Sequence, residues 1–133
     1  MHYGGDFLQL SFDETQPIYE QIIHYLKKQI ARRELGPGDR LPSQRRMARR
    51  VGVNPNTIQR AYRELEITEL VETRRGKGTF ISQDEQIIRG VRRDMAREAI
   101  QGFISEMQSI GFSGEEMLDK LKNELKVREG NER

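Results

Sequence analysis

The sequence predicts a mainly α-helical fold with one small β-hairpin, divided into a basic domain and a helical tail. Three observations predict it. Apolar residues recur every three or four positions over most of the chain, two β-type runs flank a glycine-rich turn, and charge is distributed unevenly. The 133 residues carry 23 Lys and Arg against 21 Asp and Glu, yet residues 17–81 hold 14 of these cations and only 7 of the acids. Both flanking segments are slightly acidic, which is typical of a phosphate-binding domain joined to a separate partner domain.

Residues 1–16 are expected to form an arm that precedes the first domain. Leu8, Leu10 and Phe12 alternate with polar residues, a pattern that is compatible with a short strand. The simplest role for such a strand is to cover an edge of the domain that follows.

A first helix is expected to start near Pro17, because the fixed φ of proline suits the first helical position. Glycine and proline at residues 36–38 are expected to end it. Between these limits, a core-facing stripe is formed by Ile18, Ile22, Tyr25, Leu26 and Ile30.

Two short helices should follow, joined by a tight turn. The second helix begins after Ser43, a good N-cap, and runs to about Val51, with Gly52 supplying the turn. The third has Asn54 as its N-cap and Pro55 at its first helical position. The inward residues of this pair are Met47, Ala48 and Val51, then Ile58, Ala61, Tyr62 and Leu65.

Residues 71–73 and 79–81 read as two strands around the basic turn Arg74-Arg75-Gly76-Lys77-Gly78. A helix, a turn, a second helix and a basic hairpin in this order make a winged helix-turn-helix. We assign this domain to residues 17–82.

Residues 83–133 are expected to form a two-helix dimerisation unit. One apolar stripe runs from Ile88 to Ile110 and ends at Gly111, and Ser113 with Glu116 forms a capping-box pattern that starts another helix. Two amphipathic helices alone cannot bury both stripes, which favours a homodimer over packing within one chain. The expected dimer contacts are Ile88, Val91, Met95, Phe103, Met107, Ile110, Leu118 and Leu121. No drug-sized cavity is expected within a single chain, so a small-molecule effector would bind at the dimer interface.

The helix pair and hairpin offer the chemistry that double-stranded DNA requires. A helix N-terminus attracts phosphate, and its first outward side chains reach base edges, where Asn or Gln can pair with adenine and Arg with guanine. Taken singly, each element is also compatible with an ordinary solvated surface. Together they favour DNA, with contacts expected from Ser43, Arg45, Arg46, Arg49, Asn54, Asn56, Thr57, Gln59, Arg60, Arg75, Gly76 and Lys77.

The sequence does not indicate an enzyme, a metal site or a cofactor. It has no cysteine, and His2 and His24 lack metal-ligand spacing. The hairpin residues 74–79 lack the spacing of a phosphate-binding loop. No apolar run approaches the roughly 18 residues of a membrane span, and the N-terminus lacks the pattern of a secretory signal. We therefore expect a cytoplasmic protein without membrane contact.

Three separated blocks of the chain resemble the N-terminal domain of GntR-type bacterial transcription regulators. The blocks are PIYEQI at 17–22, GPGDRLPSQRRMARRVGVNPNTIQRAYRELE at 36–66 and RRGKGTFIS at 74–82. The short helical tail resembles the YtrA-like subfamily. This resemblance implies a homodimer that binds a palindromic operator, commonly as a repressor and often near transporter genes.

By position, the contacts implied by the resemblance fall on Arg45, Asn54, Asn56, Thr57, Gln59, Arg75 and Gly76. The chain departs from the family pattern where Pro55 and Gln59 stand in place of arginine, so the family's base preference does not transfer. It also has Glu69 where glycine is usual. Either a left-handed cap is strained there, or the third helix ends differently.

Two other functions are compatible with this fold. A winged helix used as a protein-interaction module would carry aromatic or aliphatic anchors on its exposed face, yet neither Trp nor Phe occurs between Pro42 and Leu70. A non-specific architectural DNA binder would bind random duplexes as tightly as any chosen sequence.

Overall fold

The computed structural model describes residues 11–131, which form two compact units, one ending at Arg93 and the other beginning at Asp94. The expected strand at Leu8 and Leu10 therefore lies outside the described residues. The elements, in chain order, are α1 (Ile18–Ala31), β1 (Arg40–Leu41), α2 (Gln44–Val51), α3 (Pro55–Ile67), β2 (Val71–Arg74), β3 (Gly78–Ile81), α4 (Glu85–Ser109) and α5 (Gly114–Asn131). The mainly helical fold with a small sheet is confirmed.

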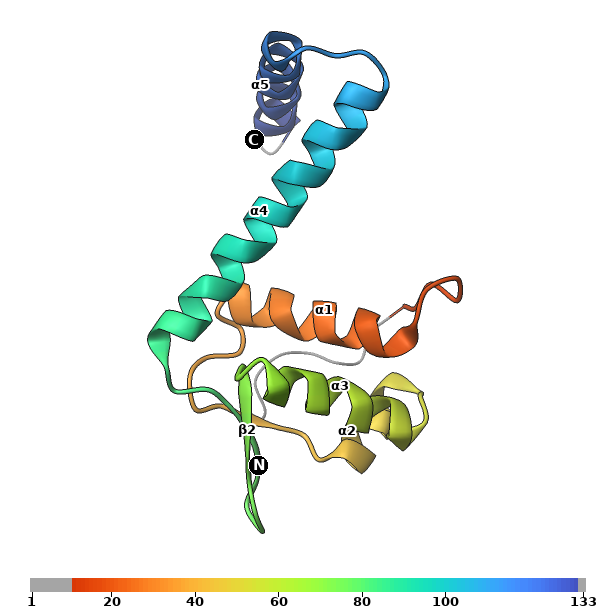
Figure 1. The fold of residues 1–133 in the computed structure, drawn as a ribbon, viewed down its shortest axis with the longest axis vertical. Coiled ribbons are helices and arrows are strands. Elements are labelled where there is room, and N and C mark those ends of the chain that lie inside the picture. Colours follow the sequence, from red (N-terminus) through yellow and green to blue (C-terminus); the bar gives the residue numbers. More distant parts are fainter. Residues whose placement is uncertain (1–10, 132–133) are drawn as a thin grey trace. The chain divides into compact units, whose positions relative to one another are not determined.

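In the first unit α3 packs against both α1 and α2, and the β2–β3 hairpin projects beyond them (Figure 1). The buried core draws on every element of this unit, with Ile22 and Leu26 from α1, Ile58 and Leu65 from α3, and Ile81 from β3 all at most 1% exposed. The apolar periodicities of the sequence thus identified most of the inward residues, whereas Ile18, Tyr25 and Val51 are only half-buried.

The sheet has the antiparallel order β1-β3-β2. Arg40 pairs with Phe80 and Leu41 with Thr79, so β3 is the central strand. The sequence pattern did not predict β1, because two residues are too short to show an alternation. This strand ties the segment before α2 to the base of the hairpin.

The helix starts of α2 and α3 follow the local capping signals. The Ser43 hydroxyl accepts a hydrogen bond from the backbone N–H of Arg46 at 3.2 Å. The Asn54 side chain accepts one from Asn56 at 2.8 Å, and the turn residue Gly52 has φ of 73°. These bonds satisfy N–H groups that a helix start otherwise leaves open.

The end of α1 differs from the expectation. The helix stops at Ala31 rather than at residues 36–38, and Arg33 adopts a left-handed φ of 63°. The N–H of Leu35 donates to the carbonyl oxygen of Gln29 at 3.2 Å, and the Leu35 side chain is fully buried. The chain reverses early because this leucine must reach the core. At the other end of α1, Pro17 is the N-cap rather than the first helical residue.

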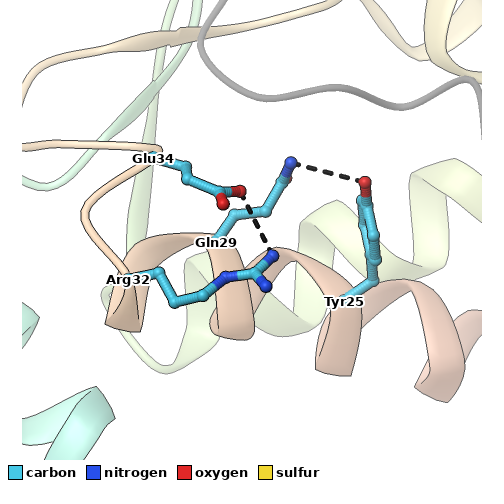
Figure 2. A network of polar contacts seen from close by, with 4 residues as sticks. All are labelled: Tyr25, Gln29, Arg32 and Glu34. Atoms are coloured by element: carbon cyan, nitrogen blue, oxygen red, sulfur yellow. Dashed lines mark hydrogen bonds and ion pairs between the residues drawn. The ribbon is translucent and has the colours of Figure 1, made fainter. Parts of the chain in front are cut away.

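A group of polar contacts lies on the last turns of α1 and on the residues that follow it (Figure 2). Gln29 is fully buried, and its amide nitrogen donates to the Tyr25 hydroxyl at 3.5 Å. Arg32 and Glu34 form an exposed ion pair at 3.2 Å close by. Tyr25, expected among apolar core residues, is therefore half-buried and carries a polar contact.

The structure shows how the chain leaves α3 at Glu69, which stands where glycine is usual. Its φ is 64°, so the chain takes the left-handed conformation after α3 although glycine is absent. The next N–H, of Leu70, donates to the carbonyl oxygen of Leu65 at 2.9 Å, and Leu70 is buried. The helix ends as it would with glycine, and the cost of the strained backbone remains.

The helical tail contributes to both units. The first turns of α4 belong to the first unit, where Arg33 and Glu85 form an ion pair at 2.6 Å. In the second unit, the N–H of Ser113 donates to Glu116 at 3.1 Å and the Ser113 hydroxyl accepts from Glu116 N–H at 3.3 Å, which is the expected capping box. None of the helices described in residues 11–131 is both long and apolar enough to cross a membrane.

Candidate nucleic-acid interface

The N-terminal tip of α3 is exposed and polar. Asn56 and Gln59 point outward, while Thr57 is half-buried. Asn54 is exposed, but its side-chain oxygen is already used to cap the helix. Asn56 and Gln59 are therefore the tip side chains best placed to reach a base edge, and Asn54 mainly sets the geometry of the tip.

A groove of about 550 Å³ lies beside this tip. Arg45 and Arg49 of α2 line it together with Asn54, and Ala48 and Val53 contribute apolar surface. The structure thus brings together three predicted contact residues from two elements. A groove lined by two guanidinium groups has the charge and the hydrogen-bond donors that phosphate binding requires.

A second groove, of about 510 Å³, separates α3 from the hairpin and is lined by Gln44, Gln59, Tyr62, Arg63, Glu66, Ile67 and Thr73. The Thr73 hydroxyl donates to the Glu66 carboxylate at 3.1 Å, which links β2 to α3. Arg63 is a candidate contact that the sequence did not single out. Its spacing of four residues from Gln59, on the same helix face, was the available signal.

At the hairpin tip the three cations have different surroundings. Arg74 forms an ion pair with Glu72 at 3.3 Å and lies over the Phe80 ring, 4.5 Å from its centroid. Arg75 and Lys77 are exposed, and Gly76 between them has φ of 74°. The predicted contacts Arg75 and Lys77 are therefore the outward cations, whereas Arg74 supports the hairpin.

Another arginine, Arg40, supports the hairpin from β1. Its guanidinium lies so close to Gly78 that a Cβ at that position would meet the Nε atom at 2.8 Å. Gly78 also has φ of 123°, which side chains rarely adopt. The backbone conformation therefore favours glycine here, and a Cβ atom would also require the Arg40 side chain to shift.

Most cations of this surface have no acidic partner. Across residues 11–131, no ion pair is formed by Arg45, Arg49, Arg60, Arg63, Arg75 or Lys77. Arg46, also predicted as a contact, is exposed on α2. Cations that are not neutralised by carboxylates are available to phosphate groups.

Arg60 is held by a neighbouring element. Its guanidinium lies over the ring of Tyr19, 3.9 Å from the centroid, in a cation–π contact between α3 and α1. The Tyr19 hydroxyl donates to Glu20 at 3.1 Å. The sequence did not indicate this contact.

The residues predicted for dimerisation fall into two groups. Ile88 and Val91 are buried within the single chain, at 1% and 7% exposed, so they have little surface left for a partner. Met95, Phe103 and Met107 are half-buried, and Ile110, Leu118 and Leu121 are exposed. In the tail, large apolar side chains that were not predicted as dimer contacts are also exposed, namely Ile100, Ile104, Leu125 and Val127.

Among the described residues there is no cluster of three or more acidic or histidine side chains that could hold a metal ion. The exposed polar helix tip, the unpaired cations and the basic hairpin together define a DNA-binding protein of the winged helix-turn-helix class.

Comparison with known proteins supplies the family. Residues 18–81 match the family described as bacterial regulatory proteins, gntR family. The chain is 46% identical over 111 residues to the HTH-type transcriptional regulator YhcF of Bacillus subtilis, covering 84% of this chain and 92% of that protein. It is 35% identical over 117 residues to the HTH-type transcriptional repressor YtrA of the same organism, covering 86% and 89%. A solved GntR family transcriptional regulator from Listeria monocytogenes superposes with a TM-score of 0.81 at 41% identity, covering 84% of this chain and 98% of that one.

The chain belongs to the GntR family. It is a DNA-binding transcription regulator with a winged helix-turn-helix, not an enzyme, and the matches to YhcF and YtrA extend beyond the DNA-binding domain into the tail.

Proposed function

We propose that the protein is a homodimeric repressor that binds a palindromic operator, with one α3 in each half-site. The observation that carries this proposal is the apolar surface of the second unit. Ile100, Ile110 and Leu118 are 57%, 65% and 58% exposed in the single chain. A surface of this kind on a monomer favours a partner.

A second copy is the occupant that explains this surface best. Burying one Leu or Ile side chain contributes about 1.5–3 kcal/mol, and a two-fold interface buries each such residue twice. The proposed seam therefore uses Met95, Phe103, Met107, Ile110, Leu118 and Leu121, together with Ile100 and Ile104. Ile88 and Val91 instead stabilise the first unit.

The DNA side of the proposal rests on the unpaired cations around α3. Asn56 and Gln59 would read bases, while Arg45, Arg49 and Lys77 would contact phosphates on either side. Repression is the direction that the similarity to YtrA supports, since that relative is named a transcriptional repressor.

Selection of bound duplexes from a random pool by the full chain tests the proposal directly. We expect an enriched palindrome whose half-sites lie about one helical turn, roughly 34 Å, apart. Scrambling either half should abolish specific binding. Enrichment of no motif despite tight binding would indicate an architectural DNA binder, and no binding at all would indicate a protein-interaction module.

The dimer is tested by sedimentation of wild type and two matched variants. Leu118→Asp places a charge in the proposed seam, whereas Asn123→Asp places the same charge at an exposed polar position on the same helix. We expect only the first variant to be monomeric and to lose operator binding. A monomeric wild type that binds the palindrome tightly would refute the homodimer.

A further inference from the structure

The outward face of α3 is divided into two flanks and a centre. Gln59 and Arg63 line the groove on the side of the hairpin, together with Thr73 of β2. Arg60 lies on the opposite flank, where its guanidinium stacks on α1. Because successive helix residues are rotated by about 100°, Asn56 falls between these flanks.

This division has a consequence in a major groove. A helix with its side chains is about 10–12 Å across, and the groove is about 12 Å wide. Side chains of the inserted face that no other element holds, such as Asn56 and Gln59, can turn toward base edges, whereas the flanks of the helix approach the two sugar-phosphate backbones. A side chain that another element holds on one flank of α3 is therefore directed toward one sugar-phosphate backbone of the DNA.

The stack on Tyr19 leaves the donors of Arg60 available. A cation–π contact uses the flat face of the guanidinium, whereas its N–H groups point outward in the plane of the group. Arg60 has no carboxylate partner among residues 11–131. The planar fork of an arginine matches the oxygens of a phosphate group.

We infer that Tyr19 is a positioning residue for DNA binding, which holds Arg60 as a contact to the phosphate backbone on the α1 side of the recognition helix. This inference rests on the proposed function, in which α3 enters the major groove. Arg60, which the sequence predicted as a DNA contact, is thereby assigned to phosphate rather than to a base edge. The contact with Tyr19 also gives α1 a part in DNA binding beyond packing on α3.

A double-mutant cycle with the full chain tests the inference. Binding is measured by fluorescence anisotropy on two probes, the duplex selected by wild type and a scrambled duplex of the same composition, each over a series of salt concentrations. The variants are Tyr19→Leu, Tyr19→Phe, Arg60→Ala, Arg60→Lys and the double variant Tyr19→Leu with Arg60→Ala.

Arg60→Ala should weaken binding to both probes by the same factor and reduce the log–log salt slope by about 0.9, the loss of one phosphate contact. Tyr19→Leu should weaken binding about two- to fivefold in the wild-type background, the range of an exposed cation–π contact, with the salt slope unchanged. In the Arg60→Ala background Tyr19→Leu should have no further effect. Tyr19→Phe keeps the ring and should bind as wild type does.

Three results would overturn the inference. Equal losses from Tyr19→Leu in both backgrounds would show that the ring acts through general stability. A larger loss on the selected duplex than on the scrambled one for Arg60→Ala would make Arg60 a base reader. Undiminished binding by Arg60→Ala would remove it from the interface.

Arg60→Lys tests the same contact without altering Tyr19, should Tyr19→Leu fail to fold. It keeps the charge but loses the flat stack, so we expect a loss similar to that of Tyr19→Leu, and wild-type affinity would overturn the inference. Wild type serves as the control for the underlying function. If it binds neither duplex, the proposed function fails; if it binds and the cycle shows no coupling, only this inference fails.

Discussion

Glu69 ends the recognition helix in a backbone conformation that favours glycine. Its φ is 64°, and the hydrogen bond from Leu70 N–H to Leu65 at 2.9 Å holds the chain in this turn. A left-handed residue with a side chain costs about 1–2 kcal/mol. Glu69 forms no ion pair in residues 11–131 that would offset this cost.

We predict that Glu69→Gly stabilises the protein by about 0.5–1 kcal/mol. Glycine removes the left-handed strain of about 1–2 kcal/mol, but its greater freedom in the unfolded chain returns about 0.4–1 kcal/mol. For a domain of this size the gain corresponds to a rise in melting temperature of roughly 2–8 °C. Urea unfolding followed by circular dichroism measures it as a higher midpoint at unchanged slope.

Glu69→Ala is the matched control, because it removes the same carboxylate and keeps the Cβ atom. We expect it to leave stability nearly unchanged. An equal gain from both variants would assign the effect to charge, and a loss of stability in Glu69→Gly would refute the strain argument. Among residues 11–131 the other non-glycine residue with a left-handed φ is Arg33, which is unsuitable for comparison because its ion pair with Glu85 would be lost as well.

Three further predictions concern the interface and the tail. Arg45→Ala should weaken operator binding at least about tenfold at one fixed salt concentration, as expected for the loss of a hydrogen bond to a charged group. Lys122→Ala on α5 should leave operator binding unchanged, and equal effects of the two variants would show that the winged helix does not bind the operator. Gly78→Ala should destabilise the hairpin by about 1–3 kcal/mol in thermal unfolding, because residues with a side chain rarely adopt φ of 123°. Gly76→Ala, at the less strained φ of 74°, should cost less, and an equal loss from both would contradict this. Two hydrogen bonds with Ser113 lower the pKa of the Glu116 carboxyl, the larger effect coming from the Ser113 backbone N–H and the smaller from its side chain. Wild type should therefore be more stable than Glu116→Gln at a pH above the ordinary glutamate pKa, and this difference should disappear as the pH falls through the lowered pKa of Glu116. A difference that persists in acid would contradict this prediction.

The helix-turn-helix was predictable because its signals are local. Ser43 and Asn54 cap helices through hydrogen bonds to residues two or three positions away, and Gly52 supplies the left-handed turn between them. Short-range chemistry of this kind is visible in any window of the sequence. The apolar periodicity then indicated which faces of the helices are buried.

Features that depend on distant partners were not predictable. β1 exists because Arg40 and Leu41 pair with β3, and two residues cannot show a strand pattern. Similarly, α1 ends early so that Leu35 can reach the core. In each case the deciding contact is tertiary, and no local preference reports it.

The continuous stripe on α4 shows the same limit. Its spacing is uniform along the helix, yet Ile88 and Val91 are buried within the single chain whereas Ile110 is exposed. Periodicity identifies an apolar face but not what covers it. The structure divides the stripe at Arg93, which leaves only its later part for the proposed dimer seam.

By itself, the sequence determined the helices, their caps, the basic hairpin and the membership in a class of DNA-binding regulators, because capping, periodicity and charge are properties of neighbouring residues. The tertiary structure alone decided which cations are held by other side chains. Arg74 is held by Glu72 and Phe80, and Arg60 rests on Tyr19 of another helix. The physical reason is that a side chain's availability depends on what the fold brings beside it, and Tyr19 and Arg60 become neighbours only when α1 packs on α3.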